Sequence, residues 1–188
     1  MNPQMQRETR RVHRRPSHRH PGGPASRPVP VGEVVLKGLF AGAVGVAAMT
    51  LAEKIEQRFT GRPNSYVPAH TLERLAGLEH KPDSQRLALN HTMHWGQGIL
   101  LGVVRAFMAR GGWQGAVPSF LFTALRLTND QLLENATRVG APPWTWPKDE
   151  QRIDVLHKSI YGFVTGFVAD QLFADRTRVR DSNWYARR

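Results

Sequence analysis

The chain has 188 residues, enough for one main domain, and a formal net charge of +11. It contains no cysteine, which excludes disulfides, thiolate metal sites and thiol catalysis. The mean hydropathy of −0.42 argues against a membrane protein, but much of this value comes from arginine-rich ends. Residues 1–32 carry seven Arg and one Glu, and residues 175–188 carry five Arg and two Asp.

Residues 1–30 are predicted to be a disordered, Arg- and Pro-rich arm, because they offer almost nothing to bury. Residues 177–188 form a second basic tail. The partner expected for both ends is the anionic head groups of a lipid bilayer. A specific nucleic-acid partner is not expected, since the arm lacks interleaved aromatic residues and any recognisable binding module.

Helices are predicted over residues 31–60, 68–78, 83–110, 114–139 and 148–176. Proline and glycine separate them at 61–63, 82, 111–112 and 140–147. The second helix is short and amphipathic, with apolar residues on one face. No run of alternating apolar and polar residues is long enough to suggest a sheet, so the fold class is all-α.

Four apolar stretches lie within the long helices, at 38–52, 95–109, 113–127 and 155–173. Three of them contain a GxxxG motif, which lets helices approach closely in lipid. The glycines concerned are Gly38, Gly42, Gly98, Gly102, Gly162 and Gly166. We therefore predict a four-span helical transmembrane bundle over residues 31–176, with the short helix 68–78 as an addition. The basic ends place both termini in the cytoplasm, and the sequence leaves open a homo-oligomer.

In such a bundle alternate spans run in opposite directions, so many ionisable residues fall at one end. This predicted polar cluster consists of Glu53, His91, His94, Asp130, Glu134, Asp154, His157 and Lys158. At the opposite end Lys37, Arg105 and Asp170 are predicted to form ion pairs. Because a charge facing lipid is expensive, these side chains should face one another or a watery cavity.

The cluster has two open interpretations. It either holds the bundle together or serves proton sensing or conduction. In a poorly hydrated space we expect carboxylates to be harder to ionise and neighbouring imidazoles to be stabilised as cations. Proton uptake near neutral pH would follow.

A metal ion or haem is the alternative use of the same residues. Asp154-x-x-His157 resembles in spacing the Glu-x-x-His pairs of di-iron bundles, and His94 and His157 could ligate a haem. The protein would then be a soluble or peripheral helical-bundle oxidoreductase. The favoured expectation is no cofactor and no catalytic residue, since phosphate-binding loops, nucleophile elbows and His-Glu-x-x-His motifs are absent from the sequence.

Several short motifs resemble those of small bacterial inner-membrane proteins of the YagU-like group. The matching pieces are Gly38–Gly45, His94-Trp95-Gly96, Trp113-Gln114-Gly115, Pro142-Pro143-Trp144 and Leu156-His157-Lys158. The likeness covers about residues 31–174. It implies location in a bacterial inner membrane and no particular mechanism. The favoured role is therefore a non-enzymatic structural or stress-related membrane protein.

Overall fold

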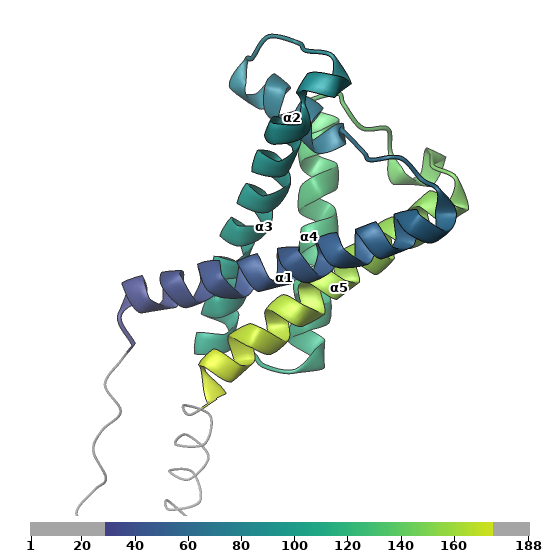
Figure 1. Ribbon diagram of the computed structural model, residues 1–188. Helices are drawn as coiled ribbons and strands as arrows, with labels where there is room; N and C mark the ends of the chain where they lie inside the picture. The colour runs from purple at the N-terminus through teal and green to yellow at the C-terminus, as the bar shows by residue number, and fades with distance from the viewer. Residues whose placement is uncertain (1–28, 175–188) are drawn as a thin grey trace, which may run out of the picture.

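The computed structural model describes residues 29–174. The predicted arm 1–30, apart from its last two residues, and the predicted tail 177–188 lie outside this range. The described part is helical (Figure 1). Its elements are α1 (Val31–Thr60), α2 (Val67–Ala76), the 3-10 turn η2 (Asp83–Gln85), α3 (Leu87–Arg110), α4 (Ala116–Ala136), the 3-10 turn η3 (Pro143–Thr145) and α5 (Lys148–Leu172). The prediction of an all-α protein is confirmed.

The prediction of a four-span bundle is wrong. Among residues 29–174, α1 is the one helix long and apolar enough to cross a membrane, with a window of mean hydropathy 1.9. The other three long helices fall short because they carry charged side chains inside the molecule, such as Arg105 on α3, Asp130 on α4 and Lys158 on α5. The arrangement also differs, since α1 crosses α3 steeply and packs against α5 (Figure 1).

Glycines allow α1 to lie almost backbone to backbone on α3. A Cβ added at Gly102 would come within 2.3 Å of the Gly38 carbonyl oxygen and 2.5 Å of the Gly42 Cα. One added at Gly42 would lie 2.7 Å from the carbonyl oxygen of Gly98. The small residues predicted from the GxxxG spacing thus line the crossing point of the two helices.

The glycines of α5 face α4 instead. A Cβ at Gly162 would meet Thr123 Oγ1 at 2.0 Å, and one at Gly166 would meet Ser119 Oγ at 2.2 Å. Short hydroxyl side chains therefore fill the space that each glycine leaves, and the two helices pack closely along these positions.

The interior of the described part combines two apolar clusters, around Val34 and around Phe122, with buried charged side chains, and its exterior carries many large apolar side chains. Arg105 and Thr165 are fully buried, and Arg126, Asp130 and Lys158 are nearly so. Large apolar side chains point outward from all four long helices, among them Leu36, Phe40, Phe59, Leu100, Phe120 and Phe167. In water this distribution would be costly, because apolar surface is the part that gains most from burial.

Two segments between the long helices shape one end of the molecule. α2 ends at Gly77, whose φ of +62° is a left-handed conformation that suits glycine. The following residues return past α2 toward the start of α3. Residues 140–147, rich in proline, lead through η3 into α5.

Candidate functional site

A cavity of about 690 Å³ lies between α1, α3, α4 and α5, at the end where α1 finishes and α3 begins. Residues of α2 and of the two connecting segments complete its wall. All eight members of the predicted polar cluster line this cavity: Glu53, His91, His94, Asp130, Glu134, Asp154, His157 and Lys158. Residues from four helices, up to about 100 positions apart in the chain, thus meet at one site.

Asp130 is the centre of the ion-pair network in the cavity wall. Its Oδ2 lies 3.1 Å from Arg126 Nε and 3.2 Å from Lys158 Nζ, and its Oδ1 accepts a hydrogen bond of 2.7 Å from Gln97 Nε2. Lys158 Nζ also donates to Asp154 Oδ1 at 2.5 Å. Two buried cations thus share two carboxylates, and α3, α4 and α5 are joined through these contacts.

Glu134 lies one turn beyond Asp130 on α4 and is a cavity carboxyl group outside this ion-pair network. Burial raises the pKa of Glu134 to about 7, because the charged form loses hydration. The cation of Lys158 opposes this rise, whereas the carboxylates of Asp130 and Asp154 add to it. Glu134 therefore changes its protonation state near neutral pH.

The two cavity histidines behave differently from the expectation. Burial lowers the pKa of His94, and the positive charge of Arg126 lowers it further. Burial also lowers the pKa of His157, more than neighbouring Glu53 and Glu56 raise it. The expectation that carboxylates stabilise these imidazoles as cations is therefore corrected, because desolvation outweighs attraction. His157 Nε2 is buried without a hydrogen-bond partner in the described part of the chain.

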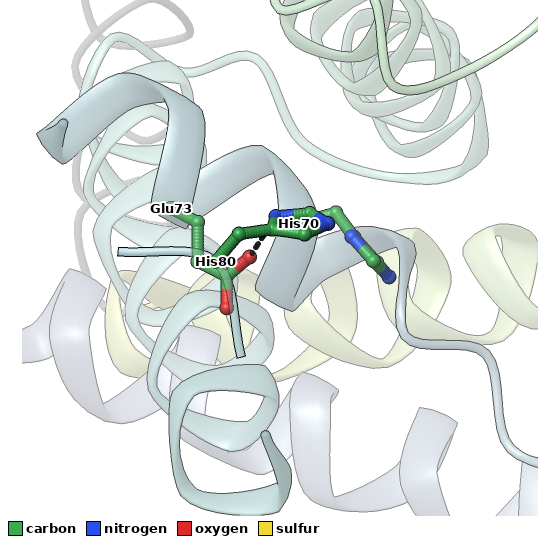
Figure 2. A group of neighbouring side chains, drawn as sticks. All are labelled: His70, Glu73 and His80. Atoms are coloured by element: carbon green, nitrogen blue, oxygen red, sulfur yellow. Dashed lines mark ion pairs between the residues drawn. The ribbon is translucent and has the colours of Figure 1, made fainter. Parts of the chain in front are cut away.

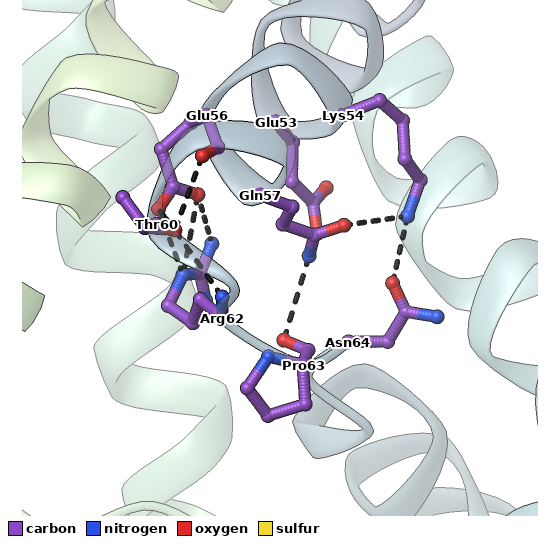
Figure 3. A network of polar contacts seen from close by, with 8 residues as sticks. All are labelled: Glu53, Lys54, Glu56, Gln57, Thr60, Arg62, Pro63 and Asn64. Carbon is purple, nitrogen blue, oxygen red and sulfur yellow. Dashed lines mark hydrogen bonds and ion pairs between the residues drawn. The ribbon is translucent and has the colours of Figure 1, made fainter.

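Polar contacts join the end of α1 to the residues that follow it (Figure 3). Arg62 binds Glu56 through two nitrogens, with Nη2 to Oε2 at 3.0 Å and Nε to the same oxygen at 3.2 Å. Lys54 Nζ donates to Asn64 Oδ1 at 2.7 Å. Gln57 Nε2 donates to Glu53 Oε1 at 3.1 Å. These bonds fix residues 61–64 beside α1, and Arg62 and Asn64 become part of the cavity wall.

The residues predicted at the opposite end are only partly paired with each other. Arg105 Nη2 contacts Asp170 Oδ1 at 2.7 Å, and Asp170 Oδ2 accepts a 2.8 Å hydrogen bond from the Gly115 backbone N–H. Lys37 pairs instead with Glu33 at 2.7 Å and donates to the Leu172 carbonyl at 3.1 Å. The Arg105–Asp170 pair thus joins α3, the start of α4 and α5.

The weak metal candidates His94, Asp154 and His157 all line the cavity, yet they do not form a compact ligand set. Within residues 29–174 such a set occurs elsewhere: the ligand atoms of His70, Glu73 and His80 lie within 4.8 Å of one another. None of these three residues was among the predicted site residues. The one signal available was the His70-x-x-Glu73 spacing, which places both side chains on one face of the short predicted helix.

Comparisons of the chain with protein-family models, with curated proteins and with solved structures find no match. The resemblance to YagU-like proteins stays a prediction.

Proposed function

We propose that this protein is a non-enzymatic, membrane-associated proton sensor that responds through the cavity between α1, α3, α4 and α5. The observation that supports this most directly is the gathering of ionisable side chains from four helices around one cavity of about 690 Å³, next to an apolar helix. A hydrated cavity of this kind gives protons access to groups that are otherwise buried.

Membrane association is supported by the outward face of α1. Leu36, Phe40, Leu51, Ile55 and Phe59 are each more than half exposed, at intervals that keep them near one side of the helix. In a bilayer, lipid chains would cover this face, so its apolar side chains would not be exposed to water. We propose the bacterial inner membrane as the location, with the basic N-terminal segment at the anionic cytoplasmic surface.

The predicted cytoplasmic position of both termini depended on four spans and loses that basis. A single crossing by α1 would separate its two ends. We therefore propose a cytoplasmic position for the N-terminal segment alone.

Sensing is favoured over conduction by the extent of the cavity. Its wall includes Arg126 and Asp130 but neither Arg105 nor Asp170, which pair at the other end of the described helices. Between the two ends α1 and α3 pack through glycines at backbone distance. A proton that enters this cavity meets a closed end.

Proton binding at Glu134 would act on the charge balance of the network. Ionised Glu134 adds a third carboxylate to those of Asp130 and Asp154. The nearby cations are Lys158 and Arg126. The other titratable groups that line the cavity are Glu53, Glu150, His91, His94, His157, Lys54 and Arg62. When Glu134 is protonated, Lys158 interacts with only two carboxylates, those of Asp130 and Asp154. The contacts between α4 and α5 would therefore differ between the two states.

The test is a pH titration of hydrogen exchange in full-length protein in liposomes. We expect exchange in residues 130–140 and 150–160 to change between pH 6 and 8, in the range of the Glu134 pKa of about 7. Glu134→Gln should remove this change, and Glu79→Gln, an exposed residue outside the cavity, should leave it intact. A pH response that survives in Glu134→Gln would contradict the sensor.

Membrane association is tested separately by carbonate extraction. The protein is expected to stay in the membrane fraction. Release into the soluble fraction would contradict the membrane part of the proposal and leave the pH experiment to decide the rest.

A further inference from the structure

A second polar group lies outside the cavity, on α2 and the segment that follows it. His70 and Glu73 are one turn apart on α2, and the left-handed Gly77 ends this helix. The Leu78 N–H donates to the Glu73 carbonyl at 2.9 Å, so the chain folds back on the helix end. This return places His80 beside Glu73 (Figure 2).

The distances in this group match those between ligands of one metal ion. His80 Nδ1 lies 3.1 Å from Glu73 Oε2, and a ring nitrogen of His70 completes a set within 4.8 Å. Two ligands bound to a tetrahedral zinc ion at 2.0–2.1 Å are roughly 3.3 Å apart. Small rotations of the two imidazoles would therefore bring all three atoms to binding distance.

Glu73 is the residue that most clearly calls for a further partner. Its side chain is only 1% exposed. Oε1 lies 2.8 Å from Arg86 Nε. Oε2 has no hydrogen bond of regular geometry within residues 29–174, and its ion-pair neighbour is His80 Nδ1 at 3.1 Å, with the backbone of Lys81 also close to the carboxylate. A buried carboxylate oxygen without a hydrogen bond is costly unless a cation binds it.

Arg86 contacts both Glu73 and His70. Arg86 Nη1 lies 3.2 Å from His70 Nε2 and contacts Asp83 Oδ1. A guanidinium can only donate hydrogen bonds, so Arg86 occupies the Nε2 lone pair of His70, and Asp83 Oδ1 lies 3.3 Å from the same nitrogen. To bind a metal through Nε2, His70 has to turn its ring away from Arg86. Asp83 and Glu73 together bring two negative charges against the single positive charge of Arg86, which leaves the group suited to a cation.

We propose that His70, Glu73 and His80 bind a zinc ion that fastens the end of α2 to the segment before α3. Two imidazoles and one carboxylate are a common zinc ligand set, and they leave one position for water or for Asp83. Access is open, because the His80 side chain is 65% exposed. Hard cations such as Mg²⁺ prefer all-oxygen ligands and should bind far more weakly.

The experiment is a titration of the full-length protein with Zn²⁺, followed by calorimetry and by thermal unfolding. One equivalent is expected to bind and to raise the melting temperature. His70→Ala and His80→Ala should each weaken binding roughly tenfold or more, since loss of a ligand costs at least as much as loss of a supporting residue. Mg²⁺ should give neither effect.

Two controls separate this site from other histidines. Residues 13, 18 and 20 are histidines of the N-terminal segment, and their triple replacement by alanine should leave the one equivalent intact. His91→Ala, in the cavity, should also leave it intact. If His80→Ala binds zinc like the parent, or if only the triple variant loses it, the site is refuted. Since His80 is largely exposed, its replacement should not prevent folding.

Discussion

Tyr161 of α5 donates a hydrogen bond of 2.6 Å from its hydroxyl to the backbone carbonyl of Gly98 on α3. The ring of Tyr161 is fully buried, and Phe122 of α4 packs against it with ring centroids 5.6 Å apart. The guanidinium of Arg126 lies over the same ring at 5.2 Å. Tyr161 therefore joins three helices and contacts Arg126, which lines the cavity.

Tyr161→Phe tests this hydrogen bond, because the ring and its packing are retained. We expect a loss of about 1 kcal/mol in the free energy of unfolding, typical for one intramolecular hydrogen bond. Denaturant unfolding in detergent measures it. A variant as stable as the parent would mean that the hydroxyl contributes nothing to the α3–α5 contact.

Gly102→Ala tests the close crossing of α1 and α3. The added Cβ would overlap the backbone of Gly38 and Gly42, so the helices would have to move apart. We expect destabilisation of about 2 kcal/mol or more, as for overpacked cores. Gly96→Ala on the same helix is the matched control, since its Cβ would meet nothing within 4 Å and alanine favours a helix by about 0.5–1 kcal/mol.

Equal stability of the two variants would contradict the close crossing of α1 and α3. If Gly102→Ala were as stable as Gly96→Ala in the same unfolding assay, the two helices could not lie at the described distance.

Asp170→Asn tests the ion pair at the end away from the cavity. Arg105 is fully buried, so neutralising its partner leaves an uncompensated charge, and we expect a loss of about 3 kcal/mol. The pair of Arg152 with Asp149 is exposed on both sides, so Asp149→Asn should change stability by less than about 1 kcal/mol. Equal effects of the two substitutions would show that Arg105 is hydrated.

Glu134→Gln tests the proton site through stability. The folded protein holds this proton up to about pH 7, whereas the ordinary pKa of 4.5 applies on unfolding. The folded state therefore binds more protons between pH 4.5 and 7, and this group makes stability fall as pH rises through that range. Above pH 7 the free-energy cost of burying the ionised Glu134 is fully present, and at pH 4 it is absent.

The variant does not titrate at this position. The free energy of unfolding of the variant, relative to that of the parent, should rise by about 1–2 kcal/mol from pH 4 to pH 8, after allowance for solvent screening. Unfolding curves of both proteins at the two pH values, with Glu79→Gln alongside, provide the measurement. A constant difference between variant and parent would place the Glu134 pKa near its ordinary value.

The sequence by itself determined the helices and much of what meets at the cavity. Pro30 and Gly61 bound α1 where predicted, since proline favours a helix start and glycine permits the left-handed end. The 3–4 residue spacing of polar positions, such as Asp130 and Glu134, put them on one helix face. The eight residues were predicted to lie together because neighbouring long helices were expected to run in opposite directions, which brings the end of one level with the start of the next.

Only the tertiary structure decided how the helices cross and which charges pair. A four-span bundle followed from apolar stretches alone, yet whether a charged side chain faces a partner or lipid depends on neighbours distant in the chain. The same holds for His80, which reaches Glu73 only because Gly77 turns the chain back. Hydropathy and spacing are local properties, whereas burial, pairing and the pKa of a group such as Glu134 are set by contacts between segments.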